Sequence, residues 1–171
     1  ILRTNTRPGI LVESWFHDYR PEALRLKSFH YNRMLGWQLV RGFLTSPVGG
    51  SGMKGAIAGD CRDLSVSCGY TNYATRGRDS YKAINGVRVT LKNSSGAVVS
   101  VGSWSAKSGD DASYYPSTQT NPMYTDNYNN GVFFFDELTA GTYTVEVFKD
   151  GYTTQTKTVT VTNDNITPCS F

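Results

Sequence analysis

Residues 125–162, TDNYNNGVFFFDELTAGTYTVEVFKDGYTTQTKTVTVT, decide the fold of this chain. Within them, apolar and polar side chains alternate with a period of two, and glycine, asparagine or aspartate marks the ends of each alternating segment. The alternation predicts that Phe133, Phe135, Tyr143 and Val145 point into a core, and that Gly141 supplies the turn conformation between two strands. The stretch therefore predicts consecutive antiparallel strands.

The same period of two occurs upstream. It is found in KGAIAG (residues 54–59), NGVRVTLKN (85–93) and AVVSVGSW (97–104). Two longer stretches, residues 59–83 and 105–127, interrupt the pattern and are predicted to be loops, where binding residues are often found. Together the segments predict a mainly β protein with an antiparallel β-sandwich over residues 53–171.

Residues 125–162 closely resemble the carboxypeptidase-regulatory-like, or prealbumin-like (transthyretin-like), β-sandwich. Upstream, INGVRVTLKNSSGAVV resembles a strand pair of that family, and KGAIAG its first strand. Because the family is mostly non-catalytic, the resemblance implies a spacer, folding aid or binding module. The residues that match its pattern T-D-x-x-G-x-F-x-F-x-x-L-x-x-G-x-Y-x-V-x-x-x-x-x-G-Y are Thr125, Asp126, Gly131, Phe133, Phe135, Leu138, Gly141, Tyr143, Val145, Gly151 and Tyr152.

Composition and charge narrow the function classes. Of 171 residues, 39% are hydrophobic, which together with the 17 glycines is typical of a globular chain, whereas the 18% of charged residues is below the usual quarter or so. The 17 basic and 14 acidic residues leave a formal charge of +3, too small and too scattered to predict a nucleic-acid partner. No apolar run approaches the roughly 20 residues of a membrane span. Abundant tyrosine, serine, threonine and asparagine favour an extracellular surface.

The first 46 residues follow a different pattern. GILVES (residues 9–14) has the continuous apolar run of a strand buried on both faces, with Glu13 at its end. Pro21 suits the first turn of a helix. After it, apolar residues recur every four positions, at Tyr31, Leu35, Leu39 and Phe43. The spacing predicts one amphipathic helix that ends near Leu44.

Three units follow from these patterns. TSPVGGSG (residues 45–52) has no periodicity and indicates a linker, so we assign residues 1–46 to a first unit, 47–52 to the linker and 53–171 to the sandwich. Because the opening residues resemble the middle of a domain, we expect the chain to be part of a longer protein.

Residues 2–43 resemble the C-terminal end of zinc-dependent N-acetylmuramoyl-L-alanine amidases, which cleave peptidoglycan. The family pattern has a proline, an apolar strand ending in Val-Glu, and a helix introduced by Pro-Glu. The matching residues are Pro8, Val12, Glu13, Phe16, Pro21, Glu22 and Leu26, whereas Trp15 stands where the family has glycine and Arg20 where it has asparagine.

This resemblance implies that Glu13 is the catalytic general base acting on a zinc-bound water, with His17 and Trp15 lining the substrate cleft. The family's zinc ligands, two histidines and a glutamate, come from segments upstream of this strand. Only His17 and His30 are present here, and they make a poor site without a third ligand. We therefore expect zinc in the intact parent enzyme and none in this chain.

Two functions follow. The main prediction is a fragment of a secreted or periplasmic cell-wall hydrolase that acts on peptidoglycan or another cell-envelope glycan. The alternative is a non-catalytic extracellular module that binds glycan or protein through an aromatic platform of Trp104, Tyr114, Tyr115, Tyr124 and Tyr128. Residues 9–43 need a partner surface, which we expect to be the sandwich, another copy of the chain, or further catalytic-domain residues.

The three cysteines have neither a C-x-x-C spacing nor a histidine at ligand spacing, so they do not predict a metal site. We predict one disulfide and one free thiol, with Cys61 and Cys68 as the favoured pair, which would indicate an oxidising compartment. A bond from either one to Cys169, or three free thiols, stays open. An isopeptide cross-link is a further alternative, formed by Lys54 and either Asn163 or Asn165 and promoted by Glu146.

Overall fold

The computed structural model describes residues 18–44, 52–70, 75, 77–101 and 120–171. Two helices come first, α1 (Arg20–Leu26) and α2 (Phe29–Leu44). The strands are β1 (Gly55–Asp60), β2 (Arg62–Ser67), β3 (Tyr81–Ala83), β4 (Arg88–Asn93), β5 (Met123–Tyr124), β6 (Val132–Leu138), β7 (Gly141–Phe148), β8 (Gln155–Val161) and β9 (Ile166–Pro168), with the 3-10 turn η2 (Gly77–Ser80) before β3. Neither helix in these ranges has the length and apolar character needed to cross a bilayer.

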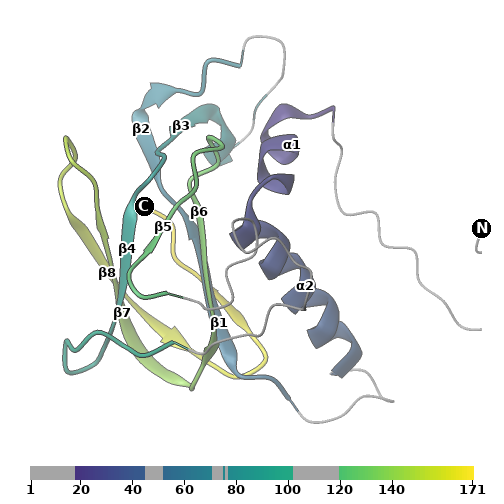
Figure 1. The fold of residues 1–171 in the computed structure, drawn as a ribbon, viewed down its shortest axis with the longest axis vertical. Helices are drawn as coiled ribbons and strands as arrows, with labels where there is room; N and C mark the ends of the chain where they lie inside the picture. The colour runs from purple at the N-terminus through teal and green to yellow at the C-terminus, as the bar shows by residue number, and fades with distance from the viewer. Residues whose placement is uncertain (1–17, 45–51, 71–74, 76, 102–119) are drawn as a thin grey trace, which may run out of the picture.

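Two sheets face each other and form the predicted sandwich. One has the strand order β6-β1-β9 and the other β5-β4-β7-β8, while β2 and β3 form a separate hairpin. In Figure 1 this hairpin and the turn between β7 and β8 lie at the same end of the sandwich. We predicted purely antiparallel sheets. This is wrong for one strand pair, because β9 runs parallel to β1. The chain is therefore mainly β, with two helices in front.

The core between the sheets contains the residues that the alternation predicts. Phe133, Phe135 and Val145 are fully buried, and Tyr143 is 8% exposed. The register places Ile57 opposite Phe135 in one sheet. The predicted inward face of the sandwich is thus confirmed.

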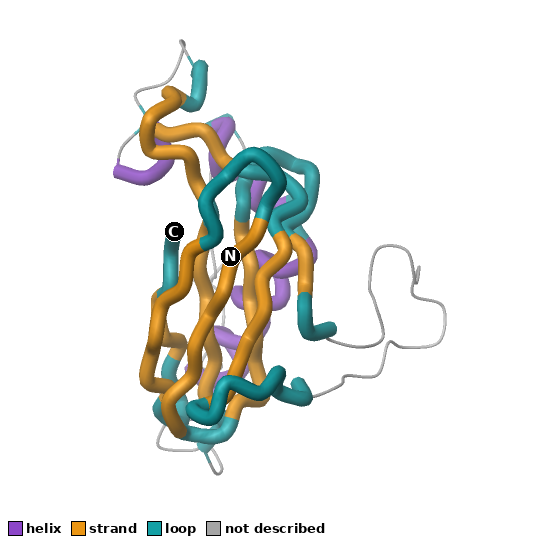
Figure 2. Tube along the Cα trace, turned by 90° about the vertical axis from the view of Figure 1, so that its left-hand side faces the viewer, coloured by secondary structure: helices purple, strands orange, loops and turns teal. Residues whose placement is uncertain are grey.

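The other face of the β6-β1-β9 sheet is also buried, because α2 covers it (Figure 1). Phe134 points away from the main core and packs with Trp37 of α2 and Ala56 of β1. Figure 2 shows the helices lying behind the strands along the sandwich. Of the three partner surfaces considered for residues 9–43, the sandwich is the one on which the described helices pack.

The predicted single helix is wrong in two respects. The helix is interrupted at Lys27 and Ser28, where the backbone N–H groups bond to the carbonyl oxygens of Leu24 and Arg25 and close a tighter turn. The predicted apolar stripe also faces the protein only in its first half, because Tyr31 is buried but Leu39 is 42% and Phe43 64% exposed. The second buried residue of the helix is Trp37, which is not in the predicted stripe.

The loop prediction for residues 59–83 is wrong, because β2, η2 and β3 lie within it. Conversely, the predicted strand 97–104 is absent from its described part, where Val98 makes an isolated bridge to Lys92. Val98 is 55% exposed. A short, exposed segment forms a strand only if a neighbouring strand pairs with it. The period of two in the sequence gives no information about such a neighbour.

The C-terminal segment lies directly against β1. The N–H of Cys169 donates to the Ala58 carbonyl and that of Phe171 to the Asp60 carbonyl, both at 2.8 Å. A Cβ at Gly59 would lie 1.9 Å from the Cys169 carbonyl oxygen, so a side chain there would push the segment away. Gly59 therefore permits this close approach.

Candidate functional site

Most of the predicted site residues lie outside the described residues: Glu13, Trp15, His17, Trp104, Tyr114 and Tyr115. The predicted catalytic cleft therefore stays a prediction. Tyr124 is on β5 and 58% exposed, and Tyr128 is 39% exposed. In the part of the chain that the structure describes, no group of three His, Cys, Asp or Glu side chains is placed to hold a metal.

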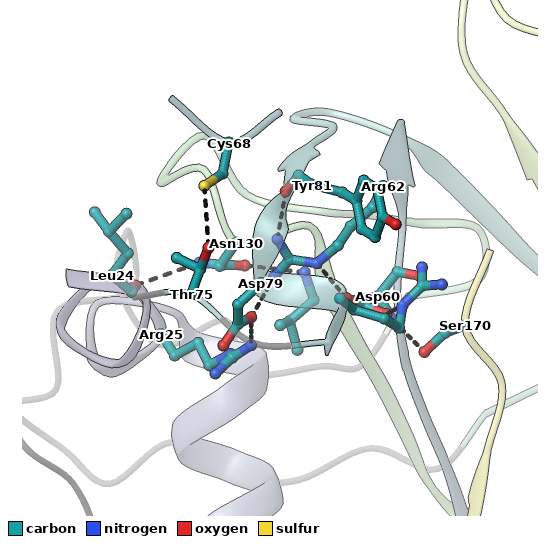
Figure 3. Close-up of polar contacts among 12 residues, drawn as sticks. Leu24, Arg25, Asp60, Arg62, Cys68, Thr75, Asp79, Tyr81, Asn130 and Ser170 are labelled. Atoms are coloured by element: carbon teal, nitrogen blue, oxygen red, sulfur yellow. Dashed lines mark hydrogen bonds and ion pairs between the residues drawn. The ribbon is translucent and has the colours of Figure 1, made fainter. Parts of the chain in front are cut away.

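A chain of ion pairs joins the hairpin to the end of the sandwich (Figure 3). Arg62 Nε lies 2.5 Å from Asp60, and its Nη2 lies 3.1 Å from Asp79. Arg25 of α1 reaches the same Asp79 carboxylate, and Arg78 Nε lies 2.7 Å from Asp60. The order along the chain of ion pairs is Arg25, Asp79, Arg62, Asp60 and Arg78. This ion chain links α1, η2, β1 and β2.

The ion chain keeps the buried carboxylate of Asp60 charged. Burial by itself raises the pKa of Asp60, but hydrogen bonds from Ser170 and Arg62 and the charges of Arg78 and Arg62 outweigh it and hold the pKa below its usual value. The Arg62 side chain is 4% exposed and also donates to the Tyr81 carbonyl at 2.9 Å. The guanidinium of Arg62 therefore has its hydrogen-bond partners within the protein.

A groove of about 340 Å³ opens beside this ion chain, between the β2–β3 hairpin and the β7–β8 turn. We call it the hairpin groove. Its apolar lining includes several residues of the main core, so the floor is hydrophobic. Its volume falls within the range of small-molecule sites. The lining residues are Cys61, Arg62, Asp63, Leu64, Arg78, Ile84, Val87, Val147, Phe148, Lys149, Tyr152, Thr153, Gln155, Lys157 and Phe171.

The aromatic residues of the hairpin groove differ in how much of each ring is available. Arg88 stacks over Phe148 at 4.8 Å from the ring centroid, and Lys157 lies 5.0 Å from the centroid of Phe171. Tyr152 follows the β7–β8 turn and is 41% exposed. Desolvation, together with the charge of Asp63 and a hydrogen bond to it, raises the pKa of Tyr152. Tyr152 and Asp63 thus approach each other across the groove.

A smaller cavity of about 220 Å³ lies beside the same hairpin, and Arg62 lines both cavities. Here the guanidinium of Arg20 lies 5.5 Å from the ring centroid of Tyr70. Cys68 also lines the smaller cavity, with its Sγ 4.0 Å from the Thr75 hydroxyl. The cavity therefore separates the start of α1 from the hairpin, and the Arg20–Tyr70 contact bridges the two.

All three cysteines are free thiols, so the predicted Cys61–Cys68 disulfide is not formed. Cys61 and Cys169 are buried in the main core, whereas Cys68 is partly exposed. Burial, assisted by the charge of Asp60, raises the pKa of Cys61 to about 12. Burial likewise raises the pKa of Cys169. The two core thiols therefore serve as small apolar side chains.

The isopeptide arrangement is also wrong. Glu146 lies on the outer face of the four-stranded sheet, between the inward-facing Val145 and Val147. There it accepts a hydrogen bond from Lys92 Nζ at 2.6 Å. A carboxylate on the outer face cannot act as the buried acid that this reaction needs.

Sequence reasoning missed the hairpin groove because its residues come from segments that lie far apart in the sequence. Tyr152 was matched to the sandwich pattern as a structural residue, and Asp63 and Arg78 fell in a predicted loop. The available signal was FKDGYT (residues 148–153), where aromatic and basic side chains flank a turn glycine. A polar turn has little need of an exposed aromatic ring for stability, so such a ring is a candidate contact residue.

Comparison with known proteins covers the C-terminal part of the chain best. The PEGA domain family model matches residues 135–170, from β6 through β9. A minor pilin of Streptococcus agalactiae is similar in structure, with a TM-score of 0.45 and 16% identity over 70% of this chain and 44% of the pilin. A Pseudomonas aeruginosa protein proposed to bind carbohydrate is similar with a TM-score of 0.34 and 20% identity, over 70% of this chain and 90% of that protein.

The chain therefore spans less than half the length of the pilin. None of these three matches is described as an amidase. No curated protein matches the chain. The comparisons thus relate residues 135–170 to the PEGA domain.

Proposed function

We propose that this chain is a non-catalytic extracellular binding module whose sandwich, of the prealbumin-like kind, holds a glycan in the hairpin groove. The observation that carries the proposal is the exposed ring of Tyr152 on the wall of a cavity with an apolar floor. A sugar presents an apolar C–H face that packs on an aromatic ring, and hydroxyl groups at its edge that need polar partners. Asp63, Thr153 and Gln155 line the groove and supply such partners.

The surroundings of the groove support binding rather than a chemical step. Asp60 and Arg62 are held in ion pairs, and Cys61 is a buried thiol whose pKa is raised to about 12 by desolvation. A nucleophile needs a neighbour that accepts its proton, and the lining of the groove contains no histidine. A preformed groove on a rigid sheet end suits recognition.

The experiment is a pull-down of the protein with insoluble peptidoglycan and with other insoluble cell-envelope glycans. We expect the wild type to bind at least one of them, and Tyr152→Ala to weaken that binding by roughly tenfold, which corresponds to about 1.4 kcal/mol. Tyr81→Ala is the matched control, because Tyr81 is 38% exposed, does not line the groove and is not part of the alternative tyrosine platform. Equal binding by both variants would place the ligand elsewhere.

The alternative platform can be tested in the same assay. Tyr124 is more exposed than Tyr152 and lies on β5, outside the groove lining. If Tyr124→Ala removes binding while Tyr152→Ala does not, the ligand contacts the predicted tyrosine platform. A protein ligand would be indicated if every glycan fails and a cell-envelope protein binds in a Tyr152-dependent manner.

The location is part of the same proposal, whereas the parent protein is not. A secreted or cell-envelope location follows from the proposed glycan ligand. An amidase parent with zinc remains a separate prediction that rests on Glu13, and the described residues offer no ligand set for the metal. Zinc analysis of the purified full-length protein would test it, because a zinc content near one ion per chain requires ligands outside the described residues.

A further inference from the structure

We infer that the hairpin groove selects a negatively charged glycan, whose anionic group lies among Arg78, Lys149 and Lys157. This inference rests on the proposed function, because it names the class of glycan that the same groove takes. All three cations line the groove, and Asp63 is the one acidic side chain in its lining. The charge of the lining therefore favours an anion.

The ion chain leaves a positive charge at the groove. It contains three guanidinium groups, those of Arg25, Arg62 and Arg78, and two carboxylates, those of Asp60 and Asp79. Within these five side chains, positive charges thus exceed negative ones by one. Arg78 is its most exposed member, with 36% of the side chain accessible. Its Nε and Nη2 are used within the protein, while its Nη1 makes no hydrogen bond to the described residues.

Lys157 and Arg78 converge on the same piece of backbone. Lys157 Nζ donates to the carbonyl of Ser170, and Arg78 Nη2 donates to the carbonyl of Phe171. Both cations are thus anchored on the last two described residues, Lys157 at Ser170 and Arg78 at Phe171, and both line the groove. Lys157 contacts the Ser170 carbonyl and the Phe171 ring, and neither of these groups carries a charge that would neutralise the ammonium group. Lys157 has no acidic partner among the described residues.

Lys149 is the third cation and has no ion pair or hydrogen-bond partner for its ammonium group in the described chain. Its Nζ would lie 3.3 Å from a Cβ placed at Gly86. Gly86 is in the turn between β3 and β4 and has a φ of +60°, so glycine is favoured there for its backbone as well. The bare turn leaves room for the lysine beside the groove.

Asp63 determines how the ligand is oriented in the groove. Hydrogen bonds from the Ser65 side chain and backbone lower the pKa of Asp63, so this carboxylate is charged at neutral pH. Its negative charge repels an anion from the Tyr152 side, where its carboxylate oxygens can accept hydrogen bonds from sugar hydroxyls. The anionic group of the ligand is therefore expected at the Arg78–Lys157 side, with a sugar ring on Tyr152.

The test is isothermal titration calorimetry with three soluble probes of similar length. These are an oligogalacturonate, which carries carboxylates, a neutral galactose oligomer, and a phosphate-bearing glycan polymer. We expect either anionic probe to bind roughly tenfold more tightly than the neutral one at low salt. The preference should shrink as salt rises from about 0.01 M to about 1 M, where the Debye length falls from about 30 Å to about 3 Å. Comparison of the two anionic probes identifies the carboxylate or the phosphate as the source.

Variants separate this inference from the proposed function. The double variant Lys149→Gln with Lys157→Gln is expected to remove most of the preference for anionic probes while retaining binding of the neutral oligomer. The double variant Lys27→Gln with Lys54→Gln is the charge-matched control, since both lysines are exposed and neither lines the groove. Thermal unfolding of each variant checks that it is folded.

The outcomes are distinct. Equal binding of anionic and neutral probes, or an unchanged preference in the double variant, overturns the charge selection and leaves glycan binding intact. If Tyr152→Ala leaves the binding of every probe unchanged, the groove is not the site and both proposals fail. If no probe binds, the charge selection fails, and the pull-down with insoluble glycans decides the proposed function separately.

Discussion

Arg33 of α2 and Asp136 of β6 form an ion pair between the helix and the outer face of the sheet, with Arg33 Nη2 2.6 Å from Asp136 Oδ2. The two partners are unequally buried, because 22% of the arginine side chain is exposed but 3% of the aspartate. Burial raises the pKa of Asp136, and the nearby charge of Arg33 opposes that rise. The charged form of Asp136 therefore needs the guanidinium of Arg33, whereas Arg33 can also be solvated by water.

The first prediction concerns this asymmetry. We expect Arg33→Met to destabilise the protein by about 3 kcal/mol, because it leaves a buried carboxylate without its cation. Asp136→Asn should cost less, since it removes the buried charge and Arg33 retains access to water. Urea unfolding at neutral pH measures both values. Equal costs would show that solvent reaches Asp136.

The second prediction follows from the direction of the Asp136 pKa. Its folded-state pKa lies above the ordinary value of 3.8, so the folded protein takes up this proton before the unfolded chain does as the pH falls. Protonation then favours the folded state and removes the need for a cation. The stability deficit of Arg33→Met relative to the wild type should thus shrink as the pH is lowered from about 7 to about 4. A deficit that is constant over this range would contradict the assignment.

The third prediction tests the packing of α2. Trp37 is 5% exposed and contacts the buried Phe134, so Trp37→Ala should cost about 3–5 kcal/mol by leaving a cavity. Phe43→Ala is the control on the same helix, because Phe43 is 64% exposed, and we expect a change within about 0.5 kcal/mol. Chemical denaturation followed by tryptophan fluorescence or circular dichroism distinguishes the two. Similar losses would mean that the sequence-predicted stripe, which includes Phe43, is the buried one.

The fourth prediction concerns acid stability at the ion chain. The folded-state pKa of Asp60 is below 3.8, because hydrogen bonds and arginine charges outweigh its desolvation. Its contribution to stability is therefore present above pH 3.8 and is lost as the pH falls through the folded pKa. Asp60→Asn should be less stable than the wild type at neutral pH and approach it in strong acid. Asp150→Asn, at an exposed position, should follow the wild-type profile throughout.

The fifth prediction concerns the thiols. A thiol reagent at mildly alkaline pH should modify Cys68 rapidly in the native protein, while Cys61 and Cys169 react only after unfolding, because both are buried and their pKa values are raised. Three thiols should be titrated in denaturant. A count of one would instead indicate the disulfide that the cysteine spacing suggests.

The sequence was sufficient where one physical rule dominates. Alternation placed Phe133, Phe135, Tyr143 and Val145 in the core, because each strand there presents one face to the opposite sheet. It did not predict the burial of Phe134, because that depends on α2, which covers the second face. The run Val132–Asp136 is buried without interruption, which is the pattern of a strand covered on both sides.

The helix and the groove were harder to predict for a common reason. A four-residue spacing selects Leu39 and Phe43, yet both remain exposed, because burial on α2 depends on which residues meet the sheet and not on the spacing alone. The groove combines Asp63 from β2, Arg78 from η2 and Tyr152 from the β7–β8 turn, and no local pattern relates these positions. Tertiary neighbours decide both features.

The pairing of β1 with β9 has a consequence for synthesis of the chain. β1 begins at Gly55, whereas its parallel neighbour starts at Ile166, near the last residue described. During synthesis on the ribosome, more than half of the sequence must therefore be added after β1 before its second edge can be paired. Contacts between such distant residues slow folding, and the exposed edge of β1 is open to other strands in the meantime. Nascent chains that stall before Ile166 should accordingly depend on chaperones more than the completed protein does.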